Sequence, residues 1–164
     1  SLGRVARDHD PELIKIIKES AKAARVEHLL TRSYQTLSGG EKSRVHLARI
    51  FAQLWDQHNG IMLIDEPLAA LDPGLQIELL SSIVDFCQNR SLALVAILHD
   101  IQQAIEGFER LILIKDGKIF ADLPSHPAPQ RELELLYEMK LERFSRPGRK
   151  DLLLPCNSRC SDII

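Results

Sequence analysis

The stretch LSGGEKSRVHLAR, residues 37–49, decides how this sequence is interpreted. Ser38 and Glu41 have the S-x-x-E spacing of a capping box, in which the serine caps the first turn of a helix and the glutamate reaches back to it. Gly39 and Gly40 have no side chains, so a phosphate could approach the backbone closely. The free N–H groups and the positive end of the helix dipole would face that anion. The stretch is therefore either a well-capped helix that binds nothing or the phosphate-binding start of a helix.

Two apolar runs in the sequence end in ionisable side chains. Residues 61–64 are continuously apolar, which predicts a parallel strand buried on both faces, and Asp65 and Glu66 follow directly. A second run, 92–98, predicts another buried strand that ends at His99. Ligands bind at the carboxyl ends of strands in open α/β sheets, and two adjacent acids are costly to bury without a cation. Mg²⁺ with a nucleotide would supply that cation. Solvated acids in a loop and a structural histidine are the alternatives.

Four segments in this order resemble the motifs of the ATP-binding subunits of ABC transporters. LSGGE at 37–41 resembles the signature, IMLIDE at 61–66 the Walker B strand, ALD at 70–72 the D-loop, and LHD at 98–100 the switch-histidine segment. The resemblance implies an α/β fold, namely the C-terminal part of a P-loop ABC ATPase domain. Such a domain has a parallel sheet core flanked by helices, together with a helical subdomain.

The resemblance also implies roles for single residues at the end of the Walker B strand. Asp65 would belong to the Mg²⁺ shell, through water, and Glu66 would polarise the attacking water as general base. His99 would contact the γ-phosphate, so Glu66 and His99 are the expected catalytic residues and should face one pocket. Asp72 of the D-loop would contribute to the nucleotide site. With Pro73 behind it, Asp72 is also suited to cap the next helix, and the two roles do not exclude each other.

In the family, two subunits enclose two ATP molecules head to tail. Ser38, Gly39 and Gly40, together with Glu41, would then cover a nucleotide that is held mainly by a second ATPase subunit, which predicts a homodimer. ATP closes such a dimer and hydrolysis reopens it, and the helical subdomain passes the motion to membrane permease subunits. The resemblance thus implies a peripheral protein on the cytoplasmic face of the inner membrane, which meets the membrane only through the permease.

The segments SYQTLSGGEKSRVHLARIFAQLW and LHDIQQAI are most similar to importers of haemin, iron-siderophores and cobalamin. The expected cargo is haemin or an iron chelate, and Trp55, directly after Ala52-Gln53-Leu54, favours haemin. The permease and a binding protein select the cargo, so no haem ligand is expected in this chain. Two other classes compete with this interpretation: a soluble ABC-type ATPase that acts on nucleic acid or in translation, and a fragment that folds without turning over ATP.

One motif is missing from the sequence. It contains no G-x-x-x-x-G-K-[S/T], the Walker A loop whose backbone and lysine hold the β- and γ-phosphates. We therefore expect a chain that corresponds to the part of the domain after the Q-loop, that binds ATP and Mg²⁺ weakly, and that is inactive alone. A sheet without its Walker A strand should also expose an edge or an apolar face, which predicts a non-native oligomer or poor solubility.

The composition bears on three further questions: binding to nucleic acid, spanning a membrane, and the redox state of the compartment. The 164 residues carry 21 basic and 23 acidic side chains, and a net charge of −2 gives no reason to expect binding to nucleic acid. No apolar run is long enough to span a bilayer. Three cysteines without framework spacing fit a reducing compartment. Cys156 and Cys160 could ligate a metal ion, but two thiols in a tail more often do not.

The resemblance and the local patterns together predict three parts and their elements. The parts are a helical subdomain with the signature helix (1–56), an α/β core (57–122), and a C-terminal helix and tail (123–164). Asp10-Pro11 predicts a helix start, and Asp116-Gly117 a two-residue hairpin turn. The expected helices cover 11–24, 26–30, 41–55 (largely buried), 101–108 and 130–140, the last with Leu133, Leu136, Tyr137 and Met139 facing inward.

Overall fold

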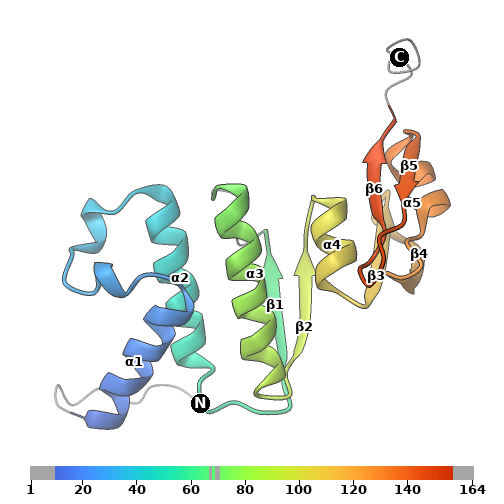
Figure 1. Ribbon diagram of the computed structural model, residues 1–164. Coiled ribbons are helices and arrows are strands. Elements are labelled where there is room, and N and C mark those ends of the chain that lie inside the picture. The colour runs from blue at the N-terminus through green and yellow to red at the C-terminus, as the bar shows by residue number, and fades with distance from the viewer. Residues whose placement is uncertain (1–9, 67, 69–70, 157–164) are drawn as a thin grey trace. The chain divides into compact units, whose positions relative to one another are not determined.

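The computed structural model describes residues 10–66, 68 and 71–156 of the chain. These residues form two compact units, one up to Ile97 and one from Leu98 onward, and each is described by itself. Figure 1 shows the helices and strands of both units. The predicted three-part division at 1–56, 57–122 and 123–164 stays a prediction.

The first unit begins with two helices joined by two short 3₁₀ turns. Helix α1 (Pro11–Ala23) starts as predicted, with the side chain of Asp10 accepting the N–H of Glu12 at 3.0 Å. The turns η1 (Glu27–Leu29) and η2 (Tyr34–Thr36) lead to α2 (Gly39–Gln53). The prediction that the signature helix is largely buried is wrong, since only Leu47 and Phe51 of α2 are buried. Several other apolar side chains of α2 line an open pocket against α1 and stay half-buried.

A βαβ unit completes the first unit. Strand β1 (Ile61–Asp65) pairs in parallel with β2 (Ala93–Ile97), and α3 (Pro73–Gln88) connects them. Helix α3 covers one face of the pair (Figure 1), where the sulfur of Cys87 lies 3.5 Å from that of Met62. Burial of β1 alternates along the strand, as on a sheet with one covered face.

The opposite face of this strand pair is exposed. It consists of Ile61, Leu63, Val95 and Ile97, whose exposed fractions are 69, 74, 48 and 54%, and we call it the bare face. The prediction of strands buried on both faces is therefore wrong for the described chain. The apolar composition of the strands is present, but no described element covers this side.

Aromatic stacking joins α2 to α3. The rings of Phe51 and Phe86 stack with centroids 4.5 Å apart. The guanidinium of Arg90 lies 3.9 Å from the Phe86 centroid and 4.5 Å from that of Trp55, and its Nε donates to the carbonyl of Trp55 at 2.9 Å. The end of α2 is thereby held against the end of α3.

The second unit contains two hairpins and two helices. Helix α4 (Ile101–Gly107) precedes β3 (Arg110–Lys115) and β4 (Lys118–Pro124), which pair antiparallel. The predicted turn is confirmed, because Asp116 and Gly117 both have positive φ, at 51° and 71°, as the two-residue turns of hairpins require. Helix α5 (Gln130–Tyr137) and a second hairpin of β5 (Leu141–Phe144) and β6 (Leu152–Pro155) follow.

One apolar cluster forms the core of the second unit, and its buried members are Ile105, Leu111, Leu113, Ala128, Leu133, Leu141 and Leu153. Leu133 and the half-buried Leu136 face this core as predicted, but Tyr137 and Met139 are exposed. Helix α5 ends at Tyr137, because Glu138 adopts a left-handed conformation and the ammonium of Lys115 contacts its carboxylate at 2.9 Å. The predicted helix over 130–140 therefore stops at Tyr137, and Met139 does not follow the helical spacing that would turn it toward the core.

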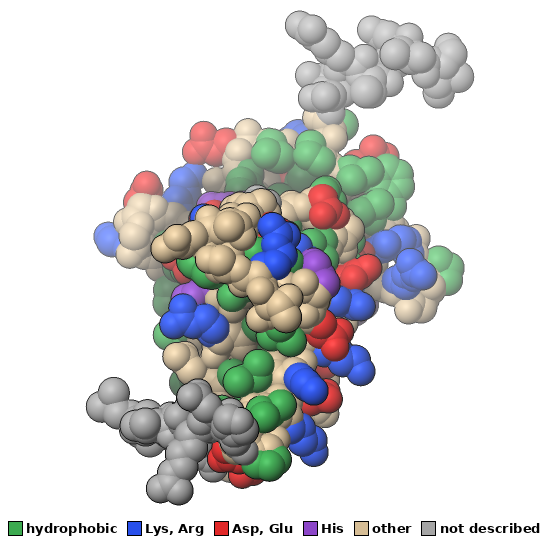
Figure 2. Space-filling view, turned by 90° about the vertical axis from the view of Figure 1, so that its left-hand side faces the viewer, with side chains coloured by type: hydrophobic (Ala, Val, Ile, Leu, Met, Phe, Trp, Pro, Cys, Tyr) green, Lys and Arg blue, Asp and Glu red, His purple; other side chains and the backbone are tan. Residues whose placement is uncertain are grey.

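The described surface carries mixed charge. On the face shown in Figure 2, basic and acidic side chains are interspersed with apolar ones. Of the helices that the structure describes, none combines the length and hydropathy that a bilayer span needs.

Candidate functional site

The start of α2 is the capping box that the sequence predicts. The hydroxyl of Ser38 accepts the N–H of Glu41 at 3.3 Å, and the carboxylate of Glu41 accepts the N–H of Ser38 at 2.7 Å. A guanidinium nitrogen of Arg32 donates to the same carboxylate at 3.1 Å. The N–H of Ser38, more than any other group, holds the pKa of Glu41 below its ordinary value, and Arg32 acts in the same direction. Glu41 is thus an anion fixed to the backbone, rather than a group free to bind a ligand directly.

Ser38 and Gly39 are exposed at this helix start. A Cβ built on Gly39 would meet no atom within 4 Å, so nothing inside the described chain requires glycine there. The first turn of α2 is therefore open to a molecule that approaches from outside.

The two acids after β1 occupy the carboxyl end of the strand, as predicted. Asp65 is exposed and lies on the same side of the strand as Ile61 and Leu63. Glu66 is also exposed, its N–H donates to the carbonyl of Ile97 at 3.2 Å, and its φ is +42°. A non-glycine residue rarely adopts this left-handed conformation. The backbone of Glu66 is thus constrained at the point where catalysis is expected.

The last residue of β1 offers Mg²⁺ an exposed carboxylate, that of Asp65. No group of three or more potential metal ligands of the His, Cys, Asp or Glu type occurs among the described residues. Mg²⁺ commonly uses one or two carboxylates, waters and substrate phosphates, and Asp65 could supply such a carboxylate. Cys156 is a free, exposed thiol, and Cys160 lies outside the described residues.

The remaining predicted residues lie in different surroundings. Asp72 caps α3, because its Oδ1 accepts the N–H of Leu75 at 3.0 Å, which confirms the structural role. Ala70 of the D-loop motif is outside the described residues. His99 is exposed and belongs to the second unit, while Glu66 belongs to the first. That these two side chains face one pocket therefore stays a prediction.

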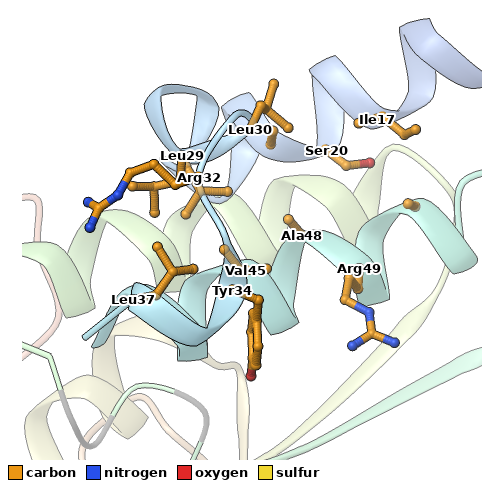
Figure 3. A pocket seen from close by; sticks show the side chains of 13 residues that line it. Ile17, Ser20, Leu29, Leu30, Arg32, Tyr34, Leu37, Val45, Ala48 and Arg49 are labelled. Carbon is orange, nitrogen blue, oxygen red and sulfur yellow. The ribbon is translucent and has the colours of Figure 1, made fainter. Parts of the chain in front are cut away.

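Sequence reasoning missed a pocket between α1 and α2. Its volume is about 240 Å³, and its lining is mainly aliphatic. Figure 3 shows Ile17 and Ser20 reaching it from α1, and Val45 and Ala48 from α2. Ser20 is only 1% exposed, and its hydroxyl has no hydrogen-bond partner among the described residues. The small side chains at Ser20 and Ala48 are the signal that could have indicated it, since they leave space between the helices.

The rim of this pocket is apolar and accessible. Ile17, Leu30 and Tyr34 line it and are about half exposed. Contiguous exposed apolar side chains of this kind mark contact surfaces for other molecules.

Known proteins resemble the chain in sequence over part of their length, although no protein-family model matches it. The hemin import ATP-binding protein HmuV of Pseudomonas aeruginosa is 44% identical over 106 residues, which are 64% of this chain and 41% of that protein. The HmuV protein of Pseudomonas entomophila is 41% identical over 154 residues, which are 90% of this chain and 59% of that protein. The chain thus spans about half the length of the curated relatives it matches.

Solved structures show the same fold. An ABC transporter of the metal-chelate type, in an inward-facing conformation, matches 97% of this chain and 62% of its own with a TM-score of 0.73 at 18% identity. The dimeric structure of a bacterial ABC transporter cassette matches 77% of this chain and 51% of its own with a TM-score of 0.63 at 27% identity. In the order of its four motifs, in its α/β fold and in these relatives, the chain is similar to the C-terminal part of the ATP-binding proteins of ABC transporters.

Proposed function

We propose that this chain is the signature and Walker B part of the ATP-hydrolysing subunit of an ABC importer for haemin or an iron chelate. The open helix start at Ser38 and Gly39, in a chain related to hemin import proteins, carries the proposal. The subunit would act at the cytoplasmic face of the inner membrane, on a permease.

The α2 start would serve a nucleotide bound to a second subunit. A glycine at position 39 is not needed by the described chain, and close approach of a phosphate is a physical reason for having it. Ser38, Gly39 and Gly40 would present N–H groups and the helix dipole to the γ-phosphate. Glu41 would act by holding Ser38 in place. A helix start cannot hold ATP alone, which is why a dimer is required.

The end of β1 would serve the nucleotide bound in the same subunit. Asp65 would hold Mg²⁺ through water, and the ion would neutralise charge on the phosphates. Glu66 would take a proton from the attacking water, His99 would contact the γ-phosphate, and Asp72 would border the site while capping α3. Because the sequence has no Walker A loop, we expect weak binding of ATP and no sustained turnover by these 164 residues alone.

The pocket between α1 and α2 would receive the permease. Its apolar lining and exposed rim at Ile17, Leu30 and Tyr34 suit an apolar side chain on a cytoplasmic helix of the partner. The unpartnered hydroxyl of Ser20 would give such a helix one polar contact.

A chimera tests the proposed activity. The matched residues of the Pseudomonas entomophila relative would be replaced by the corresponding residues of this chain, so that the relative supplies the rest of the subunit. The chimera should hydrolyse ATP, and Glu66→Gln should lower its turnover by at least about 100-fold, because the general base is lost.

The control is the isolated 164-residue chain, which should show no sustained turnover. A folded chimera without ATPase activity, or one whose activity is indifferent to Glu66→Gln, would contradict the proposal.

A further inference from the structure

Helix α4 depends on its neighbours for its place in the second unit. It has only seven residues, Ile101–Gly107, and a helix this short is not stable in isolation. Ile105 is fully buried in the core of this unit, and Ile101 and Ala104 pack against the same core. Apolar contacts are non-directional, so they hold the helix on the core without fixing its exact position.

The side chain of Gln102 supplies directional contacts from α4 to β6. Its Nε2 donates to the carbonyl of Asp151 at 3.2 Å, and its Oε1 accepts the N–H of Leu153 at 3.1 Å. These main-chain groups are two residues apart along the chain, so the amide pairs with one edge of β6 as a neighbouring strand would. Among side chains of this length, only glutamine carries both the donor and the acceptor that the pairing needs.

A second polar contact ties the other end of α4 to the same hairpin. The carboxylate of Glu106 accepts from Nε2 of Gln102 at 2.9 Å and from the guanidinium of Arg146, which lies between β5 and β6. Arg146, more than any other group, holds the pKa of Glu106 below its ordinary value, so this acceptor stays ionised. The hairpin thus holds α4 at both ends.

His99 is attached directly to the start of this helix. The next residue, Asp100, caps α4, because its Oδ1 accepts the N–H of Gln103 at 2.8 Å. His99 is exposed and only three residues from Gln102. A movement of the first turn of α4 along β6 therefore moves the backbone of His99 as well.

We propose that Gln102 is a positioning residue for His99. By bonding the edge of β6, it fixes the first turn of α4 and with it the place from which His99 presents its imidazole to the γ-phosphate. The C-terminal hairpin thereby becomes part of the catalytic arrangement, although it is distant from the four motifs in sequence. The inference rests on the proposed function for the role of His99, but the placement of His99 can be measured without nucleotide.

Nuclear magnetic resonance of the chimera, labelled with ¹⁵N in its histidine rings and free of nucleotide, tests the positioning. The ring signal of His99, assigned by its loss in His99→Ala, should shift or broaden in Gln102→Leu, because leucine has no group that bonds β6. In the same variant kcat for ATP should fall at least about tenfold while KM stays within about twofold. Misplacing one group at the reacting centre affects turnover more than the binding of a nucleotide that is held mainly elsewhere.

Gln130→Leu is the matched control. Nε2 of Gln130 donates to the carbonyl of Leu141 at 2.6 Å, so this glutamine ties α5 to the same hairpin through β5. The control should leave the His99 signal in place and kcat within about twofold. If circular dichroism shows that Gln102→Leu is unfolded, Gln102→Asn takes its place with the same expectation, because its amide is one methylene short of β6.

Three outcomes would overturn the proposal: a His99 signal that the Gln102 variant leaves unchanged, a signal that the Gln130 variant changes equally, or an unchanged kcat in the Gln102 variant of a chimera that loses its activity in His99→Ala. A signal that moves only in the Gln102 variant, in a chimera whose kcat does not depend on His99, would uphold the positioning and refute the proposed role of His99 alone.

Discussion

At the scale of single residues, the best-defined feature is the charge of Glu41. Its carboxylate accepts the N–H of Ser38 and a hydrogen bond from Arg32, and these partners hold its pKa below the ordinary value. The folded protein thus favours the ionised form. Ionised Glu41 therefore adds to the free energy of unfolding. This contribution is complete at any pH above the ordinary glutamate pKa, and it is lost as the pH falls through the lowered pKa.

Glu41→Gln should remove this acid-side dependence. Glutamine keeps a capping oxygen but cannot ionise, so the variant should be less stable than the parent at neutral pH and equally stable in acid. Urea midpoints measured across the acid range check the convergence. Other carboxyl groups with lowered pKa, such as Asp122 and Glu106, titrate in both proteins and cancel. A stability gap that does not change with pH would contradict the assignment.

At the scale of elements, Arg90 ties the end of α2 to α3. Its guanidinium stacks on Phe86 and Trp55, and its Nε bonds the carbonyl of Trp55. Arg90→Lys keeps the charge but loses the planar stack, so we expect a loss of about 1 kcal/mol in the free energy of unfolding. Chemical denaturation followed by the fluorescence of Trp55 measures it. Arg49→Lys, at an exposed position on α2, should change stability by less than about 0.5 kcal/mol.

Two neighbouring positions on α1 provide a test of permease docking. Ile17 lines the pocket, Ile14 does not, and their exposed fractions are nearly equal at 42 and 43%. In the chimera, Ile17→Asp should reduce co-purification with the hemin permease of the same bacterium several-fold, because a carboxylate is poorly tolerated in an apolar contact. Ile14→Asp should have little effect. Equal losses for both variants would argue against the pocket as the contact.

The elements also show what the sequence can predict. Asp10, Ser38 and Asp116-Gly117 act on their own backbone within three residues, and the helix starts and the turn were predicted correctly. Burial of the strands was predicted only in part. The apolar runs alone predicted burial on both faces, which is wrong, whereas the missing Walker A loop predicted an exposed apolar face, which is present at Leu63 and Val95.

The second hairpin was missed for a related reason. Strands β5 and β6 are four residues each, and two ion pairs lie beside them, Arg143 with Asp151 and Arg146 with Glu106. Pro147-Gly148 marks the turn between the two strands, and Gly148 has a φ of 69°, but four-residue strands are too short for a periodic pattern to indicate the pairing. In the candidate site, the capping box and the acids at the end of β1 could be predicted from local chemistry, whereas a shared pocket for Glu66 and His99 depends on long-range placement.

At the scale of the whole molecule, apolar surface should govern the behaviour of the chain when it is produced alone. Besides the bare face, Ile112, Ile114 and Ile119 are exposed on the β3–β4 hairpin. We expect oligomers or poor solubility, seen by light scattering, and improvement on combining Leu63→Lys with Ile114→Lys. A monodisperse monomer of the unaltered chain would contradict this expectation.

The left-handed backbone at Glu66 sets the stability of the fold against the catalytic role proposed for this side chain. At φ +42° a side chain costs conformational energy that glycine avoids. Glu66→Gly should therefore exceed Glu66→Ala in the free energy of unfolding by about 1 kcal/mol, as thermal denaturation of the two variants would show. The glutamate at this position therefore lowers the stability of the fold relative to glycine, and in exchange it supplies a carboxylate that glycine lacks.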